Sequence, residues 1–322
     1  MSRKKVVIDV PSIHEDGLKV FERAEDIDVV RFNGDQSLEE TLKDANAVLA
    51  GLSIFDKKVI ESAVQLEVIV RHGVGYDNVD VAAATAKKIP VITTPWANSS
   101  SVAEFAVSCM LALAKRLFPS NVALKRGTYR MMKRFTGIDL WGRTVGVIGI
   151  GRIGSEVVRL CRTGFHMKAI AYDPFVTHAY ANTVGAQRVE DLEELLKPSD
   201  FVTIHAPLTP LTKNMIDEKG LKLMKETAYL INTARGGIVN EEALLRALNE
   251  SWIAGAALDV LEEEPPSPDH PLVNHDKVLV TPHTAANTDE AMSRMATMAA
   301  EEILRVLSGE RPMNILNPEI YL

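Results

Sequence analysis

The ten residues VGVIGIGRIG, Val145 to Gly154, join an apolar run to three glycines spaced as G-x-G-x-x-G. The residues after them, Arg152 to Cys161, can continue as a helix, so the stretch predicts a strand, a tight turn and a helix. In such a unit Gly149 permits the turn, Gly151 lets the backbone approach a pyrophosphate, and Gly154 lets the helix pack closely on the strand. The phosphates would lie at the positive end of the helix. The stretch therefore predicts a dinucleotide site.

A second strand follows at a suitable distance along the chain. The glycine pattern alone is weak, because a chain with 19 glycines in 322 residues can match it by chance or as a purely structural unit. The run Lys168 to Tyr172 is typical of a strand, and Asp173 follows it, nineteen residues after Gly154. A carboxylate there can accept hydrogen bonds from an adenosine ribose. This context favours the dinucleotide interpretation.

Length and composition limit the number of domains and the partners. The 322 residues suggest two domains, and a net charge of -7 leaves no basic surface to attract nucleic acid or an anionic membrane. The longest apolar run, Phe105 to Ala114, is too short to span a bilayer. Cys109 and Cys161 lie in apolar helical patterns and are interpreted as reduced core thiols. We therefore expect a cytoplasmic protein with no nucleic-acid or membrane partner.

Strand and helix patterns alternate along the whole chain. The first part is expected to contain five strands, at Lys5–Val10, Asp28–Phe32, Ala47–Leu52, Val68–Val70 and Val91–Thr94. Further strands are expected at Phe201–His205, Ala228–Thr233, Ala254–Asp259 and Val278–Thr281, which bring the second part to six. Each part is predicted to be an α/β unit with a parallel sheet, the second being a doubly wound dinucleotide-binding domain.

Three helical patterns stand out. Ser99 to Arg116 is apolar nearly all round, which predicts a helix buried between domains or subunits. Asn240 to Asn249 is a capped helix, and Thr288 to about Leu307 is one more amphipathic helix.

The segment RHGVGYDNVD, Arg71 to Asp80, ends a strand and enters a glycine-rich turn. Ligands in parallel sheets bind beyond the carboxyl ends of the strands. The amides of Gly73, Val74 and Gly75 with the Arg71 guanidinium would make an anion site there. The alternative on these residues alone is a plain turn with a solvated arginine.

Three strand ends of the second part carry polar side chains that could act on a substrate. Arg235 follows a strand and precedes two glycines, and could hold a carboxylate bidentately. Asp259 ends the next strand, with Glu264 close behind it, and His283 follows the last strand. A histidine can exchange a proton with a hydroxyl at neutral pH, and a carboxylate beside it would orient the ring and stabilise its protonated form. Each residue alone has a more ordinary interpretation as a solvated charge or a structural histidine.

The remaining histidines are weaker candidates. His205 ends a strand before Ala206 and Pro207 and could border the cofactor. No His, Cys, Asp or Glu pairs have the spacing of metal ligands, so we expect no metal.

Several collinear motifs together show a resemblance that covers nearly the whole chain. They are RHGVGYDNVD, NSSSVAEFAV, LWGRTVGVIGIGRIG, YDP, HAPLTPLT, NTARGGIVNEEAL, AALDVLEEEPP and TPHTA. The sequence resembles the D-isomer-specific 2-hydroxyacid dehydrogenases, most closely the branch similar to D-3-phosphoglycerate dehydrogenase.

The resemblance assigns roles to individual residues. It implies that Arg235 binds the substrate carboxylate and carbonyl oxygen, that His283 is the acid/base and that Glu264 is its partner, and that Asp259 contacts the nicotinamide amide. Asp173 at the ribose position favours NAD over NADP. The cofactor positions implied are Gly149, Gly151, Arg152, Ile153, Gly154, Asp173, Ala206, Pro207, Thr233, Ala234, Arg235, Asp259 and His283, and the substrate positions are Arg71, Gly73, Val74, Gly75 and Arg235.

The resemblance also implies an architecture of two doubly wound parallel-sheet domains. A Rossmann-type NAD domain, residues 98–287, would be inserted into a flavodoxin-like substrate domain, residues 1–97 and 288–322. The active site would be the cleft between them, and the long helix Ser99–Arg116 would take part in a homodimer.

The resemblance implies an NAD-dependent oxidoreductase that interconverts a small D-2-hydroxy acid and its 2-oxo acid. Two departures bear on the substrate: Trp96 stands where many relatives have glycine, and Ala50–Ser53 has no arginine where phosphoglycerate-specific relatives carry one, although Lys57 or Lys58 could substitute. Reduction of glyoxylate or hydroxypyruvate is an alternative. A protein that senses NAD(H), like the corepressor branch of the family, is an alternative of another class.

Overall fold

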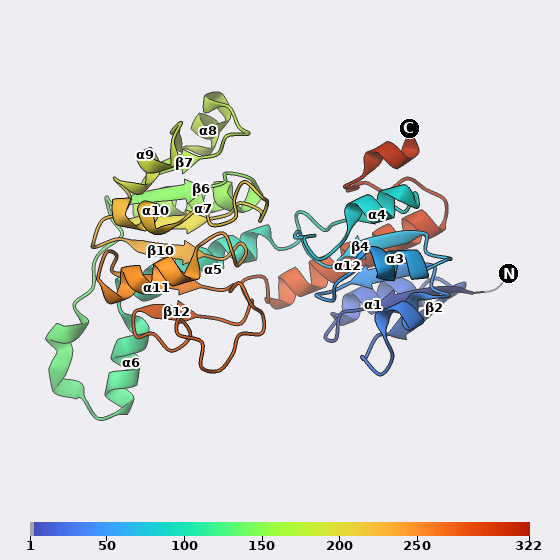
Figure 1. The fold of residues 1–322 in the computed structure, drawn as a ribbon, viewed down its shortest axis with the longest axis horizontal. Helices are drawn as coiled ribbons and strands as arrows, with labels where there is room; N and C mark the ends of the chain where they lie inside the picture. Colours follow the sequence, from blue (N-terminus) through green and yellow to red (C-terminus); the bar gives the residue numbers. More distant parts are fainter. Residues whose placement is uncertain (1–2) are drawn as a thin grey trace. The chain divides into compact units, whose positions relative to one another are not determined.

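The computed structural model describes residues 3–322, without the side chains of residues 130–132. The described chain divides into two compact units. Unit 1 runs to Asn98 and resumes from Asn287 to Leu322, and unit 2 is Ser99–Ala286. Each unit contains one parallel sheet with helices packed on it (Figure 1).

Unit 1 is built on five parallel strands in the order β2-β1-β3-β4-β5. The strands are β1 Lys4–Ile8, β2 Ile27–Arg31, β3 Ala47–Ala50, β4 Val68–Arg71 and β5 Val91–Ile92. Its helices are α1 Glu15–Glu22, α2 Leu38–Leu42, α3 Lys57–Ser62, α4 Val81–Ala86, α12 Asp289–Leu307 and the 3-10 turn η2 Pro318–Tyr321. β3 and the first three residues of β4, Val68–Val70, are apolar and fully buried, as expected of strands covered by helices on both faces. This strand order is that of a flavodoxin-like sheet.

The long helix α12 completes unit 1 after the chain has passed through unit 2. Its buried face packs into the same core as β1 and β4, with Ala296, Ala299 and Ile303 fully buried. The neighbouring helix α1 approaches closely at Gly17, where an added Cβ would lie 2.6 Å from the Ala296 Cβ. A glycine is therefore required for α1 and α12 to pack at this distance.

Unit 2 is built on seven parallel strands in the order β12-β11-β10-β9-β6-β7-β8. The strands are β6 Thr144–Ile148, β7 Lys168–Tyr172, β8 Gln187–Arg188, β9 Phe201–Ile204, β10 Tyr229–Asn232, β11 Gly255–Leu258 and β12 Val278–Val280. Its helices are α5 Ser99–Ala114, α6 Leu117–Lys125, η1 Tyr129–Phe135, α7 Arg152–Phe165, α8 His178–Val184, α9 Leu192–Leu196, α10 Glu218–Leu223 and α11 Glu241–Asn249. The order reverses at β6, beside β9, which is the switch point where such sheets bind ligands.

The fold class predicted from the sequence is confirmed, with corrections at the strand ends. Unit 2 has seven strands rather than six, because the two-residue edge strand β8 carries no apolar pattern. The predicted strand Val91–Thr94 ends at Ile92, because the amides of Thr93 and Thr94 donate to Asn314 O and Gly73 O instead of a neighbouring strand.

The apolar helix α5 packs on α7 and on β10 and β11 within unit 2. Val107, Met110 and Ala114 lie in the core beneath it, whereas Glu104 and Ser108 are exposed. In the part of the chain that the structure describes, neither α5 nor any other helix combines the length and apolar character needed to cross a membrane.

The close approach at Gly17 gives a test of this packing. We expect Gly17→Ala to destabilise the protein by about 1–3 kcal/mol, because the new methyl group overlaps Ala296. The matched control is Gly164→Ala in α7, where an added Cβ meets nothing within 4 Å. That change should be neutral or stabilising by up to about 1 kcal/mol. Thermal unfolding followed by calorimetry measures both, and equal effects would contradict the packing argument.

Candidate active site

In the glycine turn after β6, neighbouring protein atoms leave no room for a side chain at two of the three glycines. Gly149 has φ +84°, and an added Cβ there would lie 2.8 Å from His205 O. At Gly154 an added Cβ would overlap Gly149 O, so helix α7 can lie against the turn only with glycine at this position. At Gly151 a Cβ would meet nothing within 4 Å. The second glycine thus leaves open space at the N-terminus of α7, where a pyrophosphate fits.

The carboxylate of Asp173 is held beside this turn by two backbone amides. Its Oδ2 accepts from Ile150 N at 3.0 Å, and its Oδ1 accepts from Phe175 N at 3.0 Å. Each oxygen has one backbone donor and retains capacity for a second, which ribose hydroxyls could supply. Arg152 and Ile153 open α7 immediately after the turn.

Two further segments border the same edge of the sheet. His205 and Ala206, which follow β9, pack directly against Gly149. Thr233, after β10, is buried, and its Oγ1 has no hydrogen-bond partner within the described protein. A buried hydroxyl without a partner and an open glycine cradle are features that a bound dinucleotide would complete. The residues present therefore fit NAD.

His205 is unsuited to acid/base work. Burial lowers the pKa of its imidazole to about 3, so the ring is neutral. Its Nε2 lies 2.9 Å from Thr203 Oγ1. His205 therefore supports the glycine turn, beside which it packs.

Arg235 lies in a turn that a buried asparagine holds. Asn232 Nδ2 donates to Arg235 O at 2.8 Å, and Asn232 Oδ1 accepts from Ala234 N at 3.0 Å. Gly236 follows, where any Cβ would overlap Leu261 O. The turn after β10 and the turn after β11 are therefore in direct contact.

Asp259 anchors the loop that carries the histidine. Its Oδ1 accepts from Thr281 Oγ1 at 2.6 Å and from Thr284 N at 2.8 Å, and its Oδ2 accepts from Ala285 N at 2.8 Å. The side chain is 2% exposed, so these donors replace its hydration. The contact with a nicotinamide amide remains a prediction for this carboxylate.

His283 and Glu264 form a hydrogen-bonded pair at the end of this loop. His283 Nδ1 lies 2.7 Å from Glu264 Oε2, and each side chain is about one-third exposed. Glu264 Oε1 accepts from Leu261 N at 3.1 Å. His283 has φ +54°, a left-handed conformation that is costly for histidine and is maintained by the anchored loop.

The surroundings keep Glu264 ionised. Burial by itself raises the pKa of its carboxyl, but the His283 hydrogen bond and charge, the Leu261 amide and the nearby Arg235 together hold that pKa below its ordinary 4.5. An ionised carboxylate only accepts, so His283 Nδ1 is the donor of the pair. His283 Nε2 is then the ring nitrogen available to exchange a proton with a substrate.

Unit 1 carries the predicted anion turn. Arg71 is buried, and its guanidinium donates to Asn78 Oδ1, Ala50 O and His72 O. Gly73 N donates to Thr94 Oγ1 at 2.9 Å. Arg71 thus ties backbone loops together, and its contact with a substrate remains a prediction, as do those of Gly73, Val74 and Gly75.

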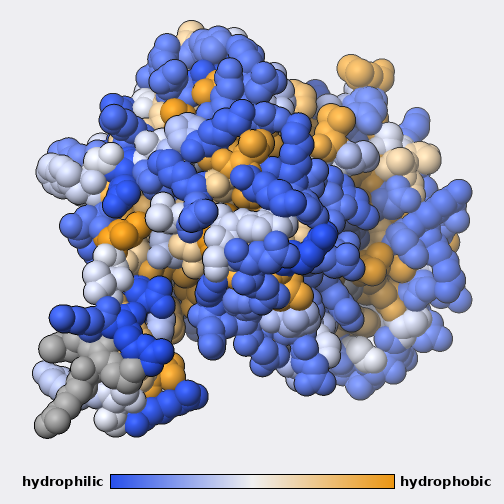
Figure 2. All heavy atoms as spheres, turned by 60° about the vertical axis from the view of Figure 1, so that its left-hand side comes forward, coloured by the Kyte–Doolittle hydropathy of each residue, from blue (hydrophilic) through white to orange (hydrophobic). Residues whose placement is uncertain are grey.

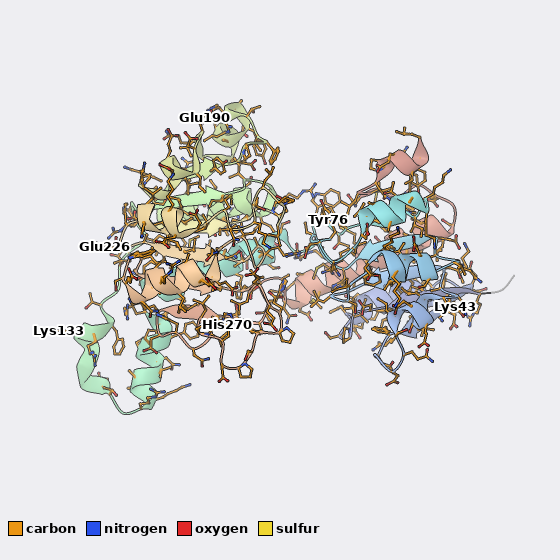
Figure 3. The ribbon with its side chains drawn as sticks, viewed as in Figure 1. Lys43, Tyr76, Lys133, Glu190, Glu226 and His270 are labelled. Atoms are coloured by element: carbon orange, nitrogen blue, oxygen red, sulfur yellow. The ribbon has the colours of Figure 1, made fainter. Side chains whose placement is uncertain are left out.

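Some residues that organise the site were missed by the sequence analysis. They are Asn232, Thr281, Asn78, Thr94 and Glu241, whose carboxylate accepts from Glu262 N and lies 3.2 Å from His270 (labelled in Figure 3). Asn232 alone has a local signal, since an asparagine directly before a turn can accept from the residue two positions on. Among the described residues, no group of three or more His, Cys, Asp or Glu side chains could hold a metal ion.

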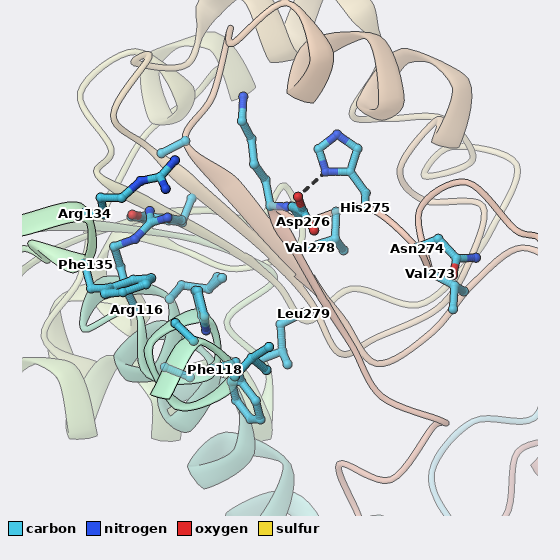
Figure 4. A pocket seen from close by; sticks show the side chains of 18 of the residues that line it. Arg116, Phe118, Arg134, Phe135, Val273, Asn274, His275, Asp276, Val278 and Leu279 are labelled. Atoms are coloured by element: carbon cyan, nitrogen blue, oxygen red, sulfur yellow. Dashed lines mark hydrogen bonds between the residues drawn. The ribbon is translucent and has the colours of Figure 1, made fainter. Parts of the chain in front are cut away.

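A hollow of about 730 Å³ lies elsewhere in unit 2 (Figure 4). It is lined by side chains of α5, α6, η1 and the β12 region, including Arg116, Phe118, Phe135 and Leu279. None of the predicted catalytic or cofactor residues lines it.

The contact between His283 and Glu264 gives a test by pH titration. We expect Glu264 to titrate below 4.5 in the protein and His283→Ala to raise that value. Because the folded-state pKa is depressed, the stability from the ionised carboxylate is present above the unfolded pKa and lost as pH falls through the folded value. Carbon-13 NMR of labelled glutamate measures the titration.

A second pair in unit 2 supplies the control. His178 Nε2 lies 2.7 Å from Glu190 Oε1 and lowers the pKa of that carboxyl. His178→Ala should raise the pKa of the Glu190 carboxyl and leave the pKa of Glu264 unchanged. A Glu264 titration insensitive to His283→Ala would contradict the pairing.

Comparison with known proteins places this geometry in a family. Residues 107–285 match the D-isomer specific 2-hydroxyacid dehydrogenase, NAD binding domain. D-3-phosphoglycerate dehydrogenase of Methanocaldococcus jannaschii is 44% identical over 97% of this chain, which spans 59% of that relative. Glyoxylate reductase of Korarchaeum cryptofilum is 39% identical, over 96% of this chain and 94% of the relative.

A solved structure shows the same fold along the chain. The TT0316 protein of Thermus thermophilus superposes with a TM-score of 0.88 at 32% identity, covering 97% of this chain and 99% of the other. The glycine cradle, the Asp173 carboxylate and the His283–Glu264 pair therefore lie on a scaffold shared with known relatives, and the chain belongs to the D-isomer-specific 2-hydroxyacid dehydrogenases, a family of NAD-dependent oxidoreductases.

Proposed function

We propose that this protein interconverts a small D-2-hydroxy acid and its 2-oxo acid with NAD. The observation that carries the proposal is the 2.7 Å contact of His283 Nδ1 with Glu264 Oε2, with Arg235 close enough to lower the pKa of the same carboxyl. A proton-exchanging imidazole beside a guanidinium matches a substrate that bears a hydroxyl next to a carboxylate. The chemistry is that of D-3-phosphoglycerate dehydrogenase and glyoxylate reductase, the relatives named above.

Three side chains of this protein have separate roles in the proposed reaction. In the direction of oxidation, His283 Nε2 takes the proton of the substrate hydroxyl, and Glu264 stabilises the imidazolium that forms. NAD, when bound, would supply the nicotinamide that accepts the hydride from C2 of the substrate. Arg235 holds the carboxylate and the carbonyl oxygen as it develops. In reduction, protonated His283 returns the proton.

The remaining site roles follow from the same proposal. Residues 98–287 bind NAD through the glycine turn, Asp173 and the segments after β9 and β10, and residues 1–97 with 288–322 bind substrate through the turn of Gly73, Val74 and Gly75. With ribose hydroxyls on Asp173, a 2′-phosphate would meet a carboxylate, which favours NAD over NADP. We propose a cytoplasmic location for the enzyme, in keeping with its two buried free thiols.

Removal of the imidazole tests the reaction. We expect His283→Ala to lower kcat by about two to four orders of magnitude, because general acid/base catalysis is lost. NADH binding, measured by fluorescence titration, should stay nearly intact. The control is His178→Ala, which removes another histidine paired with a glutamate in unit 2 and should leave kcat unchanged.

Two results would contradict the proposal. One is unchanged turnover in His283→Ala. The other is tight NADH binding by the wild-type protein without turnover of any 2-oxo acid, which would favour a protein that senses NAD(H).

We propose that two copies of the chain form a homodimer through the arm α6–η1 and helix α5. The arm exposes a set of apolar side chains, namely Leu117, Phe118, Val122, Leu124 and Tyr129. α6 packs on η1 and α5 and extends from the body of unit 2 (Figure 1), and apolar atoms are visible at the lower left of Figure 2. The hollow of Figure 4 lies beside the arm and could receive the partner's side chains.

A charge on the arm tests the homodimer. We expect Phe118→Asp to shift the protein to monomers, because a carboxylate would be buried in the interface. Phe175→Asp is the control, since Phe175 is 85% exposed and lies near α8. Light scattering after size-exclusion chromatography measures both masses, and a monomeric wild type would contradict the proposal.

A further inference from the structure

The main chain at Asp173 is held from two sides. Gly149 N, in the glycine turn, donates to Tyr172 O at 2.9 Å. On the other side, Arg188 Nε donates to Asp173 O at 3.1 Å. Arg188 lies in β8, the two-residue strand at the edge of the unit 2 sheet, beside β7. The residue that carries the proposed ribose carboxylate is therefore bound both to the glycine turn and to the edge strand.

The Arg188 guanidinium donates to a carboxylate as well as to this carbonyl. Its Nη1 donates to Oε1 of Glu190 (labelled in Figure 3) at 2.7 Å. Hydrogen bonds from His178 and Arg188 hold the pKa of the Glu190 carboxyl below its ordinary 4.5, so this group is ionised at neutral pH. Because a guanidinium is planar, the directions of its Nε and Nη1 donors are fixed relative to each other. The contact with Glu190 thus helps to set the direction in which Nε meets Asp173 O.

Arg188 is much less exposed than an arginine in an ordinary surface ion pair. Its side chain is 12% exposed, whereas that of Arg159, which pairs with Glu156 on α7, is 58% exposed. A guanidinium that has lost most of its hydration needs acceptors for its N–H groups, and a surface ion pair contributes little stability by itself. The bond to Asp173 O is therefore part of what makes the buried position of Arg188 favourable.

The amide that binds the Asp173 carboxylate is fixed by separate contacts. Ile150 N donates to Asp173 Oδ2 at 3.0 Å, and Ile150 O accepts from Ser155 Oγ at 2.9 Å. Ser155 Oγ in turn lies 3.2 Å from the hydroxyl of Tyr180, on α8. The carboxylate thus has a fixed partner in the glycine turn. Its position then depends on the main chain of Asp173, which Arg188 restrains.

We propose that Arg188 is a positioning residue for the adenosine ribose of NAD, acting through the main chain of Asp173. By holding Asp173 O, it fixes the point from which the carboxylate extends. A small displacement of that carboxylate would spoil its hydrogen bonds to ribose hydroxyls, which weaken steeply with angle and distance, and would leave the pyrophosphate contacts in place. The inference rests on the proposed function, in which Asp173 accepts from the ribose, and it extends that function to a charged residue of the edge strand.

The test compares NADH with its analogue that lacks the adenosine 2′-hydroxyl, each titrated by fluorescence against the full chain. We expect the wild type to bind NADH about tenfold or more tightly than the analogue, because a hydroxyl bonded to a carboxylate is lost. Arg188→Leu should reduce this preference to about threefold or less. Arg188→Lys should also reduce it, since an ammonium lacks the fixed fork of donors. Arg159→Leu is the matched control, because it removes another arginine paired with a glutamate in unit 2, and it should leave the preference unchanged.

A double substitution shows whether Arg188 acts through Asp173. In the otherwise unchanged protein, Arg188→Leu should raise the dissociation constant of NADH about threefold or more. In the Asp173→Ala background the same change should leave that constant unaltered, because the carboxylate that Arg188 positions is gone. A residue that merely stabilised the fold would weaken NADH equally in both backgrounds.

The outcomes separate the inference from the proposed function. A wild-type preference in both Arg188→Leu and Arg188→Lys, or equal weakening of NADH with and without the Asp173 carboxylate, would overturn the inference alone. A wild type without preference, or a preference unaffected by Asp173→Ala, would overturn the proposed ribose role of Asp173 and the inference with it. Unfolding temperatures of the variants close to that of the wild type establish that changed preferences arise in a folded protein.

Discussion

The buried carboxylate of Asp259 determines where the histidine of this site lies. An unpaired carboxylate in the core costs several kcal/mol, so its oxygens require donors. The donors come from the loop that follows β12, namely Thr281 Oγ1, Thr284 N and Ala285 N. His283 lies inside that loop, and its own amide donates to Asp259 O. The left-handed backbone of His283 is therefore stabilised by bonds on both sides of it, which brings its ring onto Glu264.

Sequence alone predicted those features that depend on neighbours close along the chain. Gly154 could be recognised because the atom its Cβ would meet, Gly149 O, lies five residues earlier in the same turn. At Gly149 the positive φ of the turn is local, whereas the close approach of His205 O comes from a distant part of the sequence. The His283–Glu264 pair could be suspected from strand ends but not established, since it depends on the Asp259 bonds across two loops. The edge strand β8 was missed because two polar residues carry no periodicity.

Arg71 shows why a charged residue next to a glycine turn has no unique interpretation. The sequence allowed an anion site or a solvated side chain, and the structure shows the guanidinium buried beside carbonyl oxygens, while the anion site stays a prediction. Arginine has five N–H donors, so it can hold several backbone segments at once. Which acceptors surround it depends on residues such as Ala50 and Asn78, which reach it only through the folded sheet.

The two units differ in how much sequence variation their loops can accommodate. In unit 2, Gly149 and Gly236 stand where any side chain would collide with backbone of another loop, so these two turns admit little sequence variation. In unit 1, Leu52 and Ile54 point largely into solvent, and exposed substitutions of this kind usually alter stability by less than about 0.5 kcal/mol. Their polarity can therefore change without loss of the fold. The turns of unit 2 therefore tolerate less sequence variation than these exposed positions of unit 1.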